Sequence, residues 1–468
     1  MNNIIQLVAQ KVKREIKKNI VNVLEGSSNL YDIVDSVNEV INNIGLDTLS
    51  FIIKELDKII LELPGRTKKY HVHKRDVKRT LITKFGELEF ERSYFKNIKE
   101  DRFVYILDEV LDIDKYERIE SNLKSEILEK SVDVSYQKAA DLSTPVSLTR
   151  ESVKRIIREN GSIDNLALEV KEKNKEVKTI YIEADEDHVP IQNGKNKEMK
   201  LIYVYDDKTK VNRGRIKLEN VRYFTGTMDP EELWTEVATY LDEAYDLEKV
   251  EKIYIAGDGA NWIKGGTEII NNSKFVLDHY HLSKYIKVIT GHLKSLDNPM
   301  DIDKPLWKSL RTKNKKLTIE LIDLAIEETP SESRKERMKE AKNYILNNWE
   351  GIINLFGEKK YKCSAEGHIS HILSARLSSR PMSWSLVGAD EMARMRAFKA
   401  NGGSLKKYYK ENRTKKRKEA RILELDQRVV KNAKRKYNTI DPDIMIDMPY
   451  TYKTKGKWLK NMLNCSGF

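Results

Sequence analysis

The hydrophobic pattern of residues 177–277 constrains the fold of this chain more than any other feature. Three runs rich in β-branched and aromatic residues come first, and polar turns separate them. A helix-like stretch, a fourth strand, a second helix and a fifth strand follow. The expected strands are 177–182, 199–205, 216–223, 252–256 and 274–277, and the expected helices are 230–246 and 260–272.

Three successive strands followed by alternating helices and strands form the element order of the RNase H-like fold. Residues 283–362 are mostly helical by pattern and too numerous for a loop, which indicates an inserted subdomain. We therefore expect a multidomain α/β protein with an RNase H-like core at 175–395 and a helical insertion at about 286–362. Helical, β-hairpin and helix-turn-helix regions are expected to precede this core.

Three acidic residues stand where such a core would hold metal ions. Asp185 follows the first strand, Asp258 follows the fourth, and Glu366 begins a helix after the insertion. Mg²⁺ prefers oxygen ligands, and two ions ~4 Å apart can hold both oxygens of a phosphoryl transfer. Taken singly, these acids are ordinary: a solvated strand end, an Asp-Gly turn and a carboxylate at a helix start. Their agreement with the element order favours a metal site, with Asp187 as the alternative first ligand because residues 183, 185 and 187 share a face.

The region before the core divides into three parts. Residues 1–62 carry helical apolar stripes, which are typical of either a dimer surface or a domain core. Residues 63–112 change to a strand alternation around Gly86, which predicts a basic β-hairpin, either a DNA-backbone contact or a charged edge strand that resists aggregation.

Residues 113–165 have a helix-turn-helix outline. The basic side chains of Arg150, Lys154 and Arg158 share one face of its second helix, and apolar residues share another. A basic face of this kind suits the major groove of DNA, although helix pairs with short turns are common in other proteins.

Positive charge is concentrated near the C-terminus. The chain has a formal net charge of +12, and residues 406–436 contain 14 Lys and Arg against 4 Asp and Glu. This segment includes Lys415, Lys416, Arg417 and Lys418. Its density favours a helix that contacts phosphates within a basic helical tail, 396–468, over a solvated helix in a Lys-rich proteome.

Composition excludes several classes of protein. With 34% charged and 40% hydrophobic residues, the chain is neither wholly disordered nor a serial membrane protein, and no stretch approaches ~20 apolar residues. Its two cysteines, Cys363 and Cys465, rule out a disulfide scaffold and fit a reducing compartment. We expect a cytoplasmic, nucleoid-associated protein with no membrane partner.

Four segments together resemble the ISLre-type bacterial insertion-sequence transposases and, more distantly, the Mutator-type DDE transposases. They are IEADEDH (182–188), AGDGANWI (256–263), LDHYHL (277–282) and SAEGHISHILSARLSSRPMSW (364–384). The resemblance covers most of the chain, including the TKFGE motif at 83–87. It implies that Asp185, Asp258 and Glu366 are the catalytic triad and the ligands of Mg²⁺, with Mn²⁺ as the alternative ion. It also implies that Asp278 and His281 form a D-x-x-H motif that orients DNA or the groups around the ligands.

Two further basic residues follow the third acid. Arg376 and Arg380 lie 10 and 14 residues after Glu366, so a continuous helix would bring them near the same face, before Pro381 ends it. That position predicts contact with DNA phosphates, and the alternative is an ordinary charged surface.

The resemblance implies a DNA transposase that cleaves insertion-sequence ends and transfers the exposed 3′-OH to target DNA by two-metal phosphoryl transfer. Its partners would be the terminal inverted repeats, target DNA and further copies of the chain in a homodimer or larger synaptic assembly. Two alternatives stay open: an RNase H-like nuclease without strand transfer, and a non-catalytic DNA-binding protein derived from a transposase. A glycoside hydrolase with paired carboxylates fits less well, because the basic tail would have no partner.

Overall fold

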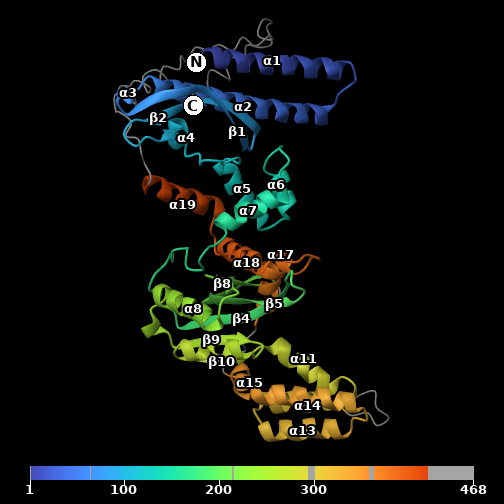
Figure 1. Ribbon diagram of the computed structural model, residues 1–468. Coiled ribbons are helices and arrows are strands. Elements are labelled where there is room, and N and C mark those ends of the chain that lie inside the picture. Colours follow the sequence, from blue (N-terminus) through green and yellow to red (C-terminus); the bar gives the residue numbers. More distant parts are fainter. Residues whose placement is uncertain (1, 64, 213–214, 294–300, 358–362, 420–468) are drawn as a thin grey trace. The chain divides into compact units, whose positions relative to one another are not determined.

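The computed structural model describes residues 2–63, 65–212, 215–293, 301–357 and 363–419, and Figure 1 labels their helices and strands. The chain forms two compact units. Unit 1 consists of Met1–Lys124, Asp141–Ser147 and Asn412–Phe468, and unit 2 of Ser125–Ala140 and Leu148–Glu411. The expected segments 1–62 and 63–112 fall in unit 1, 175–395 falls in unit 2, and 113–165 is divided between them. None of the helices in these described ranges is long and apolar enough to cross a membrane.

Unit 1 begins with two long antiparallel helices, α1 (Asn2–Leu24) and α2 (Leu30–Leu61) (Figure 1). Asn29 caps α2 by accepting a hydrogen bond from the Tyr31 amide, and the Asp32 carboxylate accepts one from the Asn29 amide. Apolar side chains of α1 and of the first half of α2 line an open groove of about 560 Å³. The second half of α2 instead buries Ile53 and Ile60 in a core.

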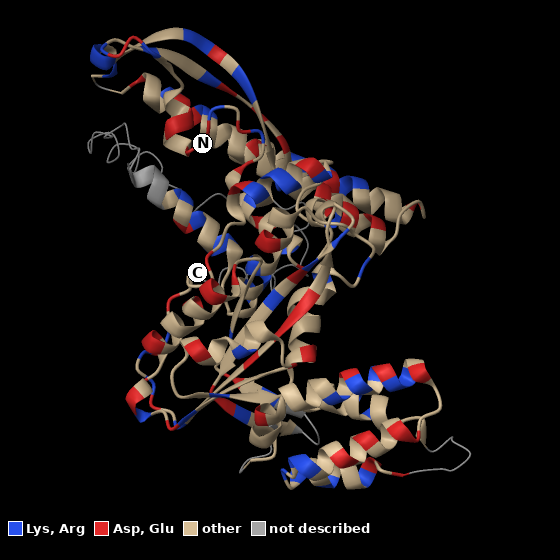
Figure 2. Ribbon diagram, turned by 60° about the horizontal axis from the view of Figure 1, so that its bottom comes forward, with Lys and Arg blue, Asp and Glu red and all other residues tan. Residues whose placement is uncertain are grey.

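That core lies between α2 and a three-stranded antiparallel sheet of order β1-β2-β3. The strands are β1 (Tyr70–Thr83), β2 (Gly86–Asn97) and β3 (Phe103–Val104), and the accompanying helices are α3 (Arg66–Lys69) and α4 (Ile106–Leu111). Thr83 pairs with Gly86 at the hairpin turn, where a φ of 135° requires glycine. Figure 2 shows Lys and Arg along this hairpin, and Lys74, Arg75 and Lys78 are exposed on β1.

Unit 2 is built around a five-stranded sheet of order β10-β9-β4-β5-β8. Its strands are β4 (Thr179–Pro190), β5 (Asn196–Tyr205), β8 (Arg222–Gly226), β9 (Lys252–Gly257) and β10 (Ser273–Leu277). β4, β5 and β8 pair antiparallel, whereas β4, β9 and β10 pair parallel. β4 is the middle strand of the sheet, and it joins the antiparallel strands to the parallel strands.

Helices cover this sheet and fill the insertion. Ile180, Ile182 and Ala184 alternate along β4 and pack with Leu233 and Trp234 of α8 (Pro230–Ala244) in one core. A second core joins β10 to the helices that follow it. These are α11 (His279–Thr290), α12 (Asp303–Arg311), α13 (Lys315–Glu327), α14 (Glu332–Asn347) and α15 (Trp349–Leu355).

The described residues form further helical elements in addition to these. They are α5 (Ser121–Ser131), α6 (Tyr136–Asp141), α7 (Arg150–Asn160), η1 (Leu247–Lys249), α16 (Ala365–Ile369), the π-helical turn η3 (Ser370–Ser374), α17 (Ala375–Leu377), α18 (Leu386–Ala400) and α19 (Leu405–Glu419).

Two of the expected elements differ from the structure. The run 216–223 does not form one strand: it is divided between β7 (Arg215–Glu219), which pairs with β6 (Asp207–Asn212) in a separate ribbon, and β8. Asn220, with a φ of 55°, bends the chain between them. The expected helix 260–272 is two short helices, α9 (Asn261–Lys264) and α10 (Gly266–Ile269), which meet at Gly265. Gly266 packs against the Trp234 ring, where a Cβ would lie 2.6 Å from a ring atom.

Candidate active site

Two aspartates lie at the same level on the inner strands of the five-stranded sheet, just beyond the point where β4 and β9 stop pairing. Asp258 directly follows β9 as expected, whereas Asp185 lies within β4, because this strand continues to Pro190. β4 and β9 run parallel, and Glu183 pairs with Ala256, so Asp185 and Asp258 each follow two residues later at the same level. Burial raises the pKa of Asp185 to about 6, and the charge of Asp258 contributes to the rise. A hydrogen bond from the Glu186 amide to Asp185 Oδ1, at 2.9 Å, opposes it. The two carboxylates are therefore close enough to repel each other.

The loop after β9 fixes Asp258. Its Oδ1 accepts a hydrogen bond from the Ala260 amide at 2.9 Å, and its carbonyl accepts one from the Tyr344 hydroxyl of α14. Gly259 has a φ of 96°, and a Cβ there would lie 2.4 Å from Asn348 Oδ1. The insertion thus packs directly against the aspartate loop, a role that the sequence pattern did not reveal.

Asp278 and His281 lie beside the same two aspartates. Asp278 caps α11 by accepting a hydrogen bond from the Tyr280 amide at 3.1 Å, and its other oxygen lies 2.9 Å from His281 Nδ1. This contact is the main cause that raises the pKa of His281, and the charges of Asp185 and Asp258 raise it further. The His281 imidazole therefore stands within electrostatic reach of the pair, which favours its protonated form.

Glu366 lies in the first turn of α16, where it is exposed to solvent. Among the described residues, no three or more His, Cys, Asp or Glu side chains are gathered as a metal site, so Glu366 does not complete such a group with the aspartates. Mg²⁺ commonly binds through one or two carboxylates and keeps several waters. The donor set of Asp185 and Asp258 fits that ion, and the third expected ligand stands apart from it.

A buried carboxylate that the sequence analysis did not single out lies two residues before Asp185. Glu183 is 0% exposed, and it accepts hydrogen bonds from the hydroxyls of Tyr203 and Tyr205 and from the amide of Ser364. The alternation of tyrosines with apolar residues in β5 was the available signal, because Tyr203 pairs with Glu183 across the sheet.

The residues expected to contact DNA have different surroundings. Arg150 and Lys154 are exposed on α7, and Lys154 pairs with Glu151 at 3.4 Å. Arg158 is half-buried and donates to Ser385 Oγ at 2.6 Å.

Arg376 is buried, whereas Arg380 is exposed to solvent. Arg376 is 6% exposed, donates to the Ser131 carbonyl at 3.2 Å and stacks over Trp384, so it serves packing in this conformation instead of facing a ligand. The cause is that the helix after Glu366 is interrupted by η3, which changes the rotation of every later side chain. Arg380 is exposed. Lys415, Lys416, Arg417 and Lys418 belong to α19, and their side chains lie outside the described part of the structure.

Comparison with known proteins finds relatives over most of the chain. Two proteins of Caldanaerobacter subterraneus subsp. tengcongensis are each 40% identical to it, over 429 and 420 residues. The first match covers 91% of this chain and 89% of the relative, and the second covers 89% and 88%. The first relative is named by eleven gene designations joined together, and a third relative from the same organism is named by four.

A solved structure, the Drosophila P element transposase strand transfer complex, matches 64% of this chain and 82% of that chain. The identity is 12% and the TM-score is 0.21, which is too low to establish a shared fold. The model of an uncharacterised protein family, UPF0236, matches residues 23–416, and both Caldanaerobacter proteins carry that family name. The chain therefore belongs to the UPF0236 family.

Proposed function

We propose that this chain is a metal-dependent DNA transposase that cuts the ends of its own insertion sequence and joins them to target DNA. The observation that carries the proposal is the pair of neighbouring aspartates just beyond the parallel pairing of β4 with β9, beside His281, whose pKa is raised. A buried carboxylate with a raised pKa, such as Asp185, is typical of catalytic sites.

The strand order supports the same proposal. An antiparallel set of three strands continued by two parallel strands, with helices between the parallel ones, is the arrangement expected of an RNase H-like core. Two acids on adjacent strands, Asp185 within β4 and Asp258 directly after β9, suit hard divalent cations.

The relatives add an independent observation. A protein of one genome that carries eleven gene designations is encoded many times in that genome. Repeated copies are the outcome of an element that multiplies by transposition, and we extend this interpretation from the relative to the present chain. A structural or metabolic protein gives no reason for such repetition.

In the proposed reaction, water attacks the phosphorus at the element end and the 3′-oxygen leaves as a hydroxyl, which then attacks target DNA. Asp185 and Asp258 would hold Mg²⁺, or Mn²⁺ as the alternative, and such ions supply Lewis-acid stabilisation of the charge on the phosphate. Glu366 would accept the proton of the attacking water, and that proton passes to the leaving 3′-oxygen, which becomes the 3′-OH. The carboxylate is then free to accept the proton of this 3′-OH in the joining step. Asp278 holds Nδ1 of His281, so that Nε2 is the ring atom able to bond a DNA phosphate.

Basic surface residues provide the remaining DNA contacts. The exposed Arg150 and Lys154 of α7, Arg380 and the hairpin strand β1 would bind the backbone of the terminal repeats and the target. Two ends must be cut and joined together, so we propose a homodimer or larger synaptic assembly.

The test is incubation of the purified protein with labelled DNA that carries the ends of its own element, in Mg²⁺ or EDTA. Nicks at the end and joined products are expected in Mg²⁺ and absent in EDTA and in Asp258→Asn. Asp229→Asn is the matched control, because Asn keeps the capping of α8 that Asp229 provides to the Glu231 amide. Cleavage without joining would replace the transposase with a nuclease, and end binding without cleavage in any variant would overturn the enzymatic proposal.

A further inference from the structure

Glu183 is an unusual residue to find at the centre of a sheet. A carboxylate that is 0% exposed needs several hydrogen bonds or a counter-charge to offset its lost hydration. Lys208 Nζ is 4.0 Å from Glu183 Oε1, which is beyond hydrogen-bond distance. The hydrogen bonds that offset the lost hydration therefore come from neutral donors. Tyr205 donates to Oε1 at 2.6 Å, and Tyr203 donates to Oε2.

The other donors to Glu183 come from the segment that begins α16. The Ser364 amide donates to Oε2 at 2.6 Å, its hydroxyl does so at 3.2 Å, and the Cys363 thiol lies 3.3 Å from the same oxygen. Charge-assisted bonds of this kind are about twice as strong as neutral ones. One oxygen of Glu183 therefore fixes the chain two residues before Glu366.

A second carboxylate of β4 fixes the far end of the same segment. Asp187 Oδ2 accepts a hydrogen bond at 2.7 Å from the hydroxyl of Ser378, which follows α17. Because residues 183, 185 and 187 alternate onto one face of β4, Asp185 lies between the two attachment points. The segment 364–378 thus runs along the strand that carries the first aspartate.

Contacts within the segment also fix the rotation of α16. Ala365 and Ile369 are buried, and His368 stacks on Tyr203 with ring centroids 4.3 Å apart while its Nδ1 lies 2.7 Å from the Tyr223 hydroxyl. His368 therefore occupies the flank of the helix over β5 and β8. At 100° per residue, Glu366 lies on the opposite flank of α16 from His368, where it is exposed.

We propose that Glu183 and Asp187 are positioning residues that clamp segment 364–378 at both ends, along the strand that carries Asp185, and so fix the position of Glu366 on the flank of α16 opposite His368. The effect of the clamp on catalysis rests on the proposed function. Its effect on how tightly segment 364–378 is held can be measured without any reaction. Neither carboxylate touches the reacting phosphate: each acts through the serine that it binds.

The first measurement is the alkylation rate of Cys363 by iodoacetamide, without metal or DNA. Cys465→Ser in the background leaves Cys363 as the only thiol, since the chain has two cysteines. Burial raises the pKa of the Cys363 thiol well above its usual range, and alkylation of the parent is expected to be slow. Glu183→Gln should accelerate it about tenfold, because loss of a charge-assisted hydrogen bond raises the population of the released segment by that order.

Three variants test whether a faster alkylation of Cys363 comes from release of the Ser364 end of the segment. Tyr205→Phe removes a donor from the other oxygen of Glu183 and should change the alkylation rate by less than about twofold. Asp187→Asn releases only the Ser378 end and should leave the Cys363 rate near that of the parent. Ser364→Ala keeps the carboxylate in place and removes one bond, so an intermediate acceleration is expected, and it serves as the test if Glu183→Gln does not fold.

The second measurement is end cleavage in Mg²⁺ beside the dissociation constant for end DNA. Glu183→Gln and Asp187→Asn should each lower the cleavage rate about tenfold or more with the dissociation constant unchanged, as expected for lost positioning of a group that acts after binding. An unchanged Cys363 rate in folded Glu183→Gln and Ser364→Ala would overturn the clamp, and so would full cleavage in both carboxylate variants. If the parent itself does not cleave, the proposed function fails and the alkylation series alone decides the clamp.

Discussion

The acidic residues of the two units have opposite surroundings. In unit 1, Asp108 is held between Arg79, at 2.6 Å, and Arg92, and all three side chains are 9% exposed. In unit 2, Asp185 and Asp258 lie next to each other, and the buried Glu183 meets hydroxyl and amide donors. In unit 1 the negative charge of Asp108 is balanced by two arginines. In unit 2 two negatively charged groups lie close together.

The pKa shifts in the two units follow from these surroundings. Burial and the neighbouring Arg79 lower the pKa of Arg92 to about 10, which shows how strongly this ion-pair cluster is desolvated. Burial and like charge instead raise the pKa of Asp185 to about 6. In a buried ion pair, loss of either partner is destabilising because it leaves a charge without compensation, whereas neighbouring acids repel each other and are typical of sites that bind a cation or move a proton.

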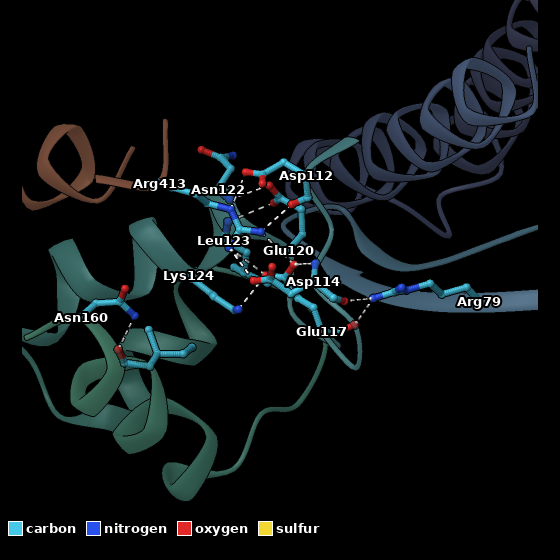
Figure 3. A network of polar contacts seen from close by, with 11 residues as sticks. Arg79, Asp112, Asp114, Glu117, Glu120, Asn122, Leu123, Lys124, Asn160 and Arg413 are labelled. Atoms are coloured by element: carbon cyan, nitrogen blue, oxygen red, sulfur yellow. Dashed lines mark hydrogen bonds and ion pairs between the residues drawn. The ribbon is translucent and has the colours of Figure 1, made fainter. Parts of the chain in front are cut away.

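A second cluster in unit 1 repeats the stabilising pattern. Figure 3 shows Arg413 of α19 among acidic residues that follow α4, with Nε 2.7 Å from Asp112 and Nη2 3.1 Å from Glu117. Lys124 donates to the same Glu117 at 2.6 Å, and Arg79 donates to the Glu117 carbonyl at 2.9 Å. The end of α19 is tied to unit 1 by these pairs.

The largest expected effect separates activity from stability in unit 2. Asp258→Asn should lower end cleavage about a thousandfold, since a metal-binding carboxylate accounts for several kcal/mol of transition-state stabilisation. Its thermal midpoint should not fall by more than about 2 °C, because the variant relieves repulsion with Asp185. Single-turnover cleavage and calorimetry on the same preparation measure both, and a large loss of stability would make Asp258 a structural residue.

The converse change in unit 1 should cost stability. Asp108→Asn leaves Arg79 and Arg92 desolvated without a counter-charge, which typically costs about 3–5 kcal/mol of unfolding free energy. Asp101→Asn is the matched control: its pair with Lys96 is exposed, and such pairs contribute about 0–1 kcal/mol. Urea denaturation distinguishes the two variants, and equal midpoints would refute the contrast between the units.

The pH dependence of stability should reveal the raised pKa of Asp185. A folded-state pKa of about 6 against an ordinary value of 3.8 means that the folded state holds the proton more tightly, so stability falls as pH rises from about 4 to 6. In EDTA, Asp185→Asn should equal the parent near pH 4 and exceed it by up to about 3 kcal/mol at pH 7. Parallel curves for the two proteins would show that Asp185 titrates normally.

The smallest effect is expected at Arg413. Its side chain is 17% exposed, and Arg413→Ala should lower the stability of unit 1 by about 1–2 kcal/mol, because three acids lose a shared partner. Lys407→Ala, which breaks an exposed pair with Glu411, should change stability by less than about 0.5 kcal/mol. Hydrogen exchange of the amides in 112–124 should rise in the first variant, and unchanged protection would place the stability of that segment elsewhere.

The sequence predicted the strands of unit 2 better than the turns and helix interruptions between its elements. Alternation and helical periodicity are local properties, so the strands at 196–205 and 252–257 were expected close to where they occur. The first strand was expected to end at 182, but β4 continues to Pro190 because its acidic half pairs with β5. The third strand was misplaced because a positive φ at Asn220 has no periodic signal. The interruption of the helix after Glu366 was likewise invisible, since η3 arises from packing and not from a helix-breaking residue.

The same division applies to the candidate site. Asp185 and Asp258 were predicted from the element order and the resemblance, and Asp278 and His281 from the resemblance alone. The structure brings these four residues together, because β4 and β9 are adjacent parallel strands and Asp278 contacts His281 within one helical turn. Burial of Arg376 and the roles of Glu183 and Tyr344 depend on partners more than 80 residues away in sequence. Spacing along the chain contains no information on such pairings.

The sequence alone determined which residue types are present, where strands and helices begin, and which acids can meet at the edge of a parallel pair, because these follow from local backbone geometry. Only the tertiary structure decided which acids are neutralised and which are not. Arg79 and Arg92 reach Asp108 across unit 1, whereas Asp185 and Asp258 face each other with His281 beside them. The charge state of a carboxylate depends on the groups within a few ångströms of it, and folding alone selects those groups.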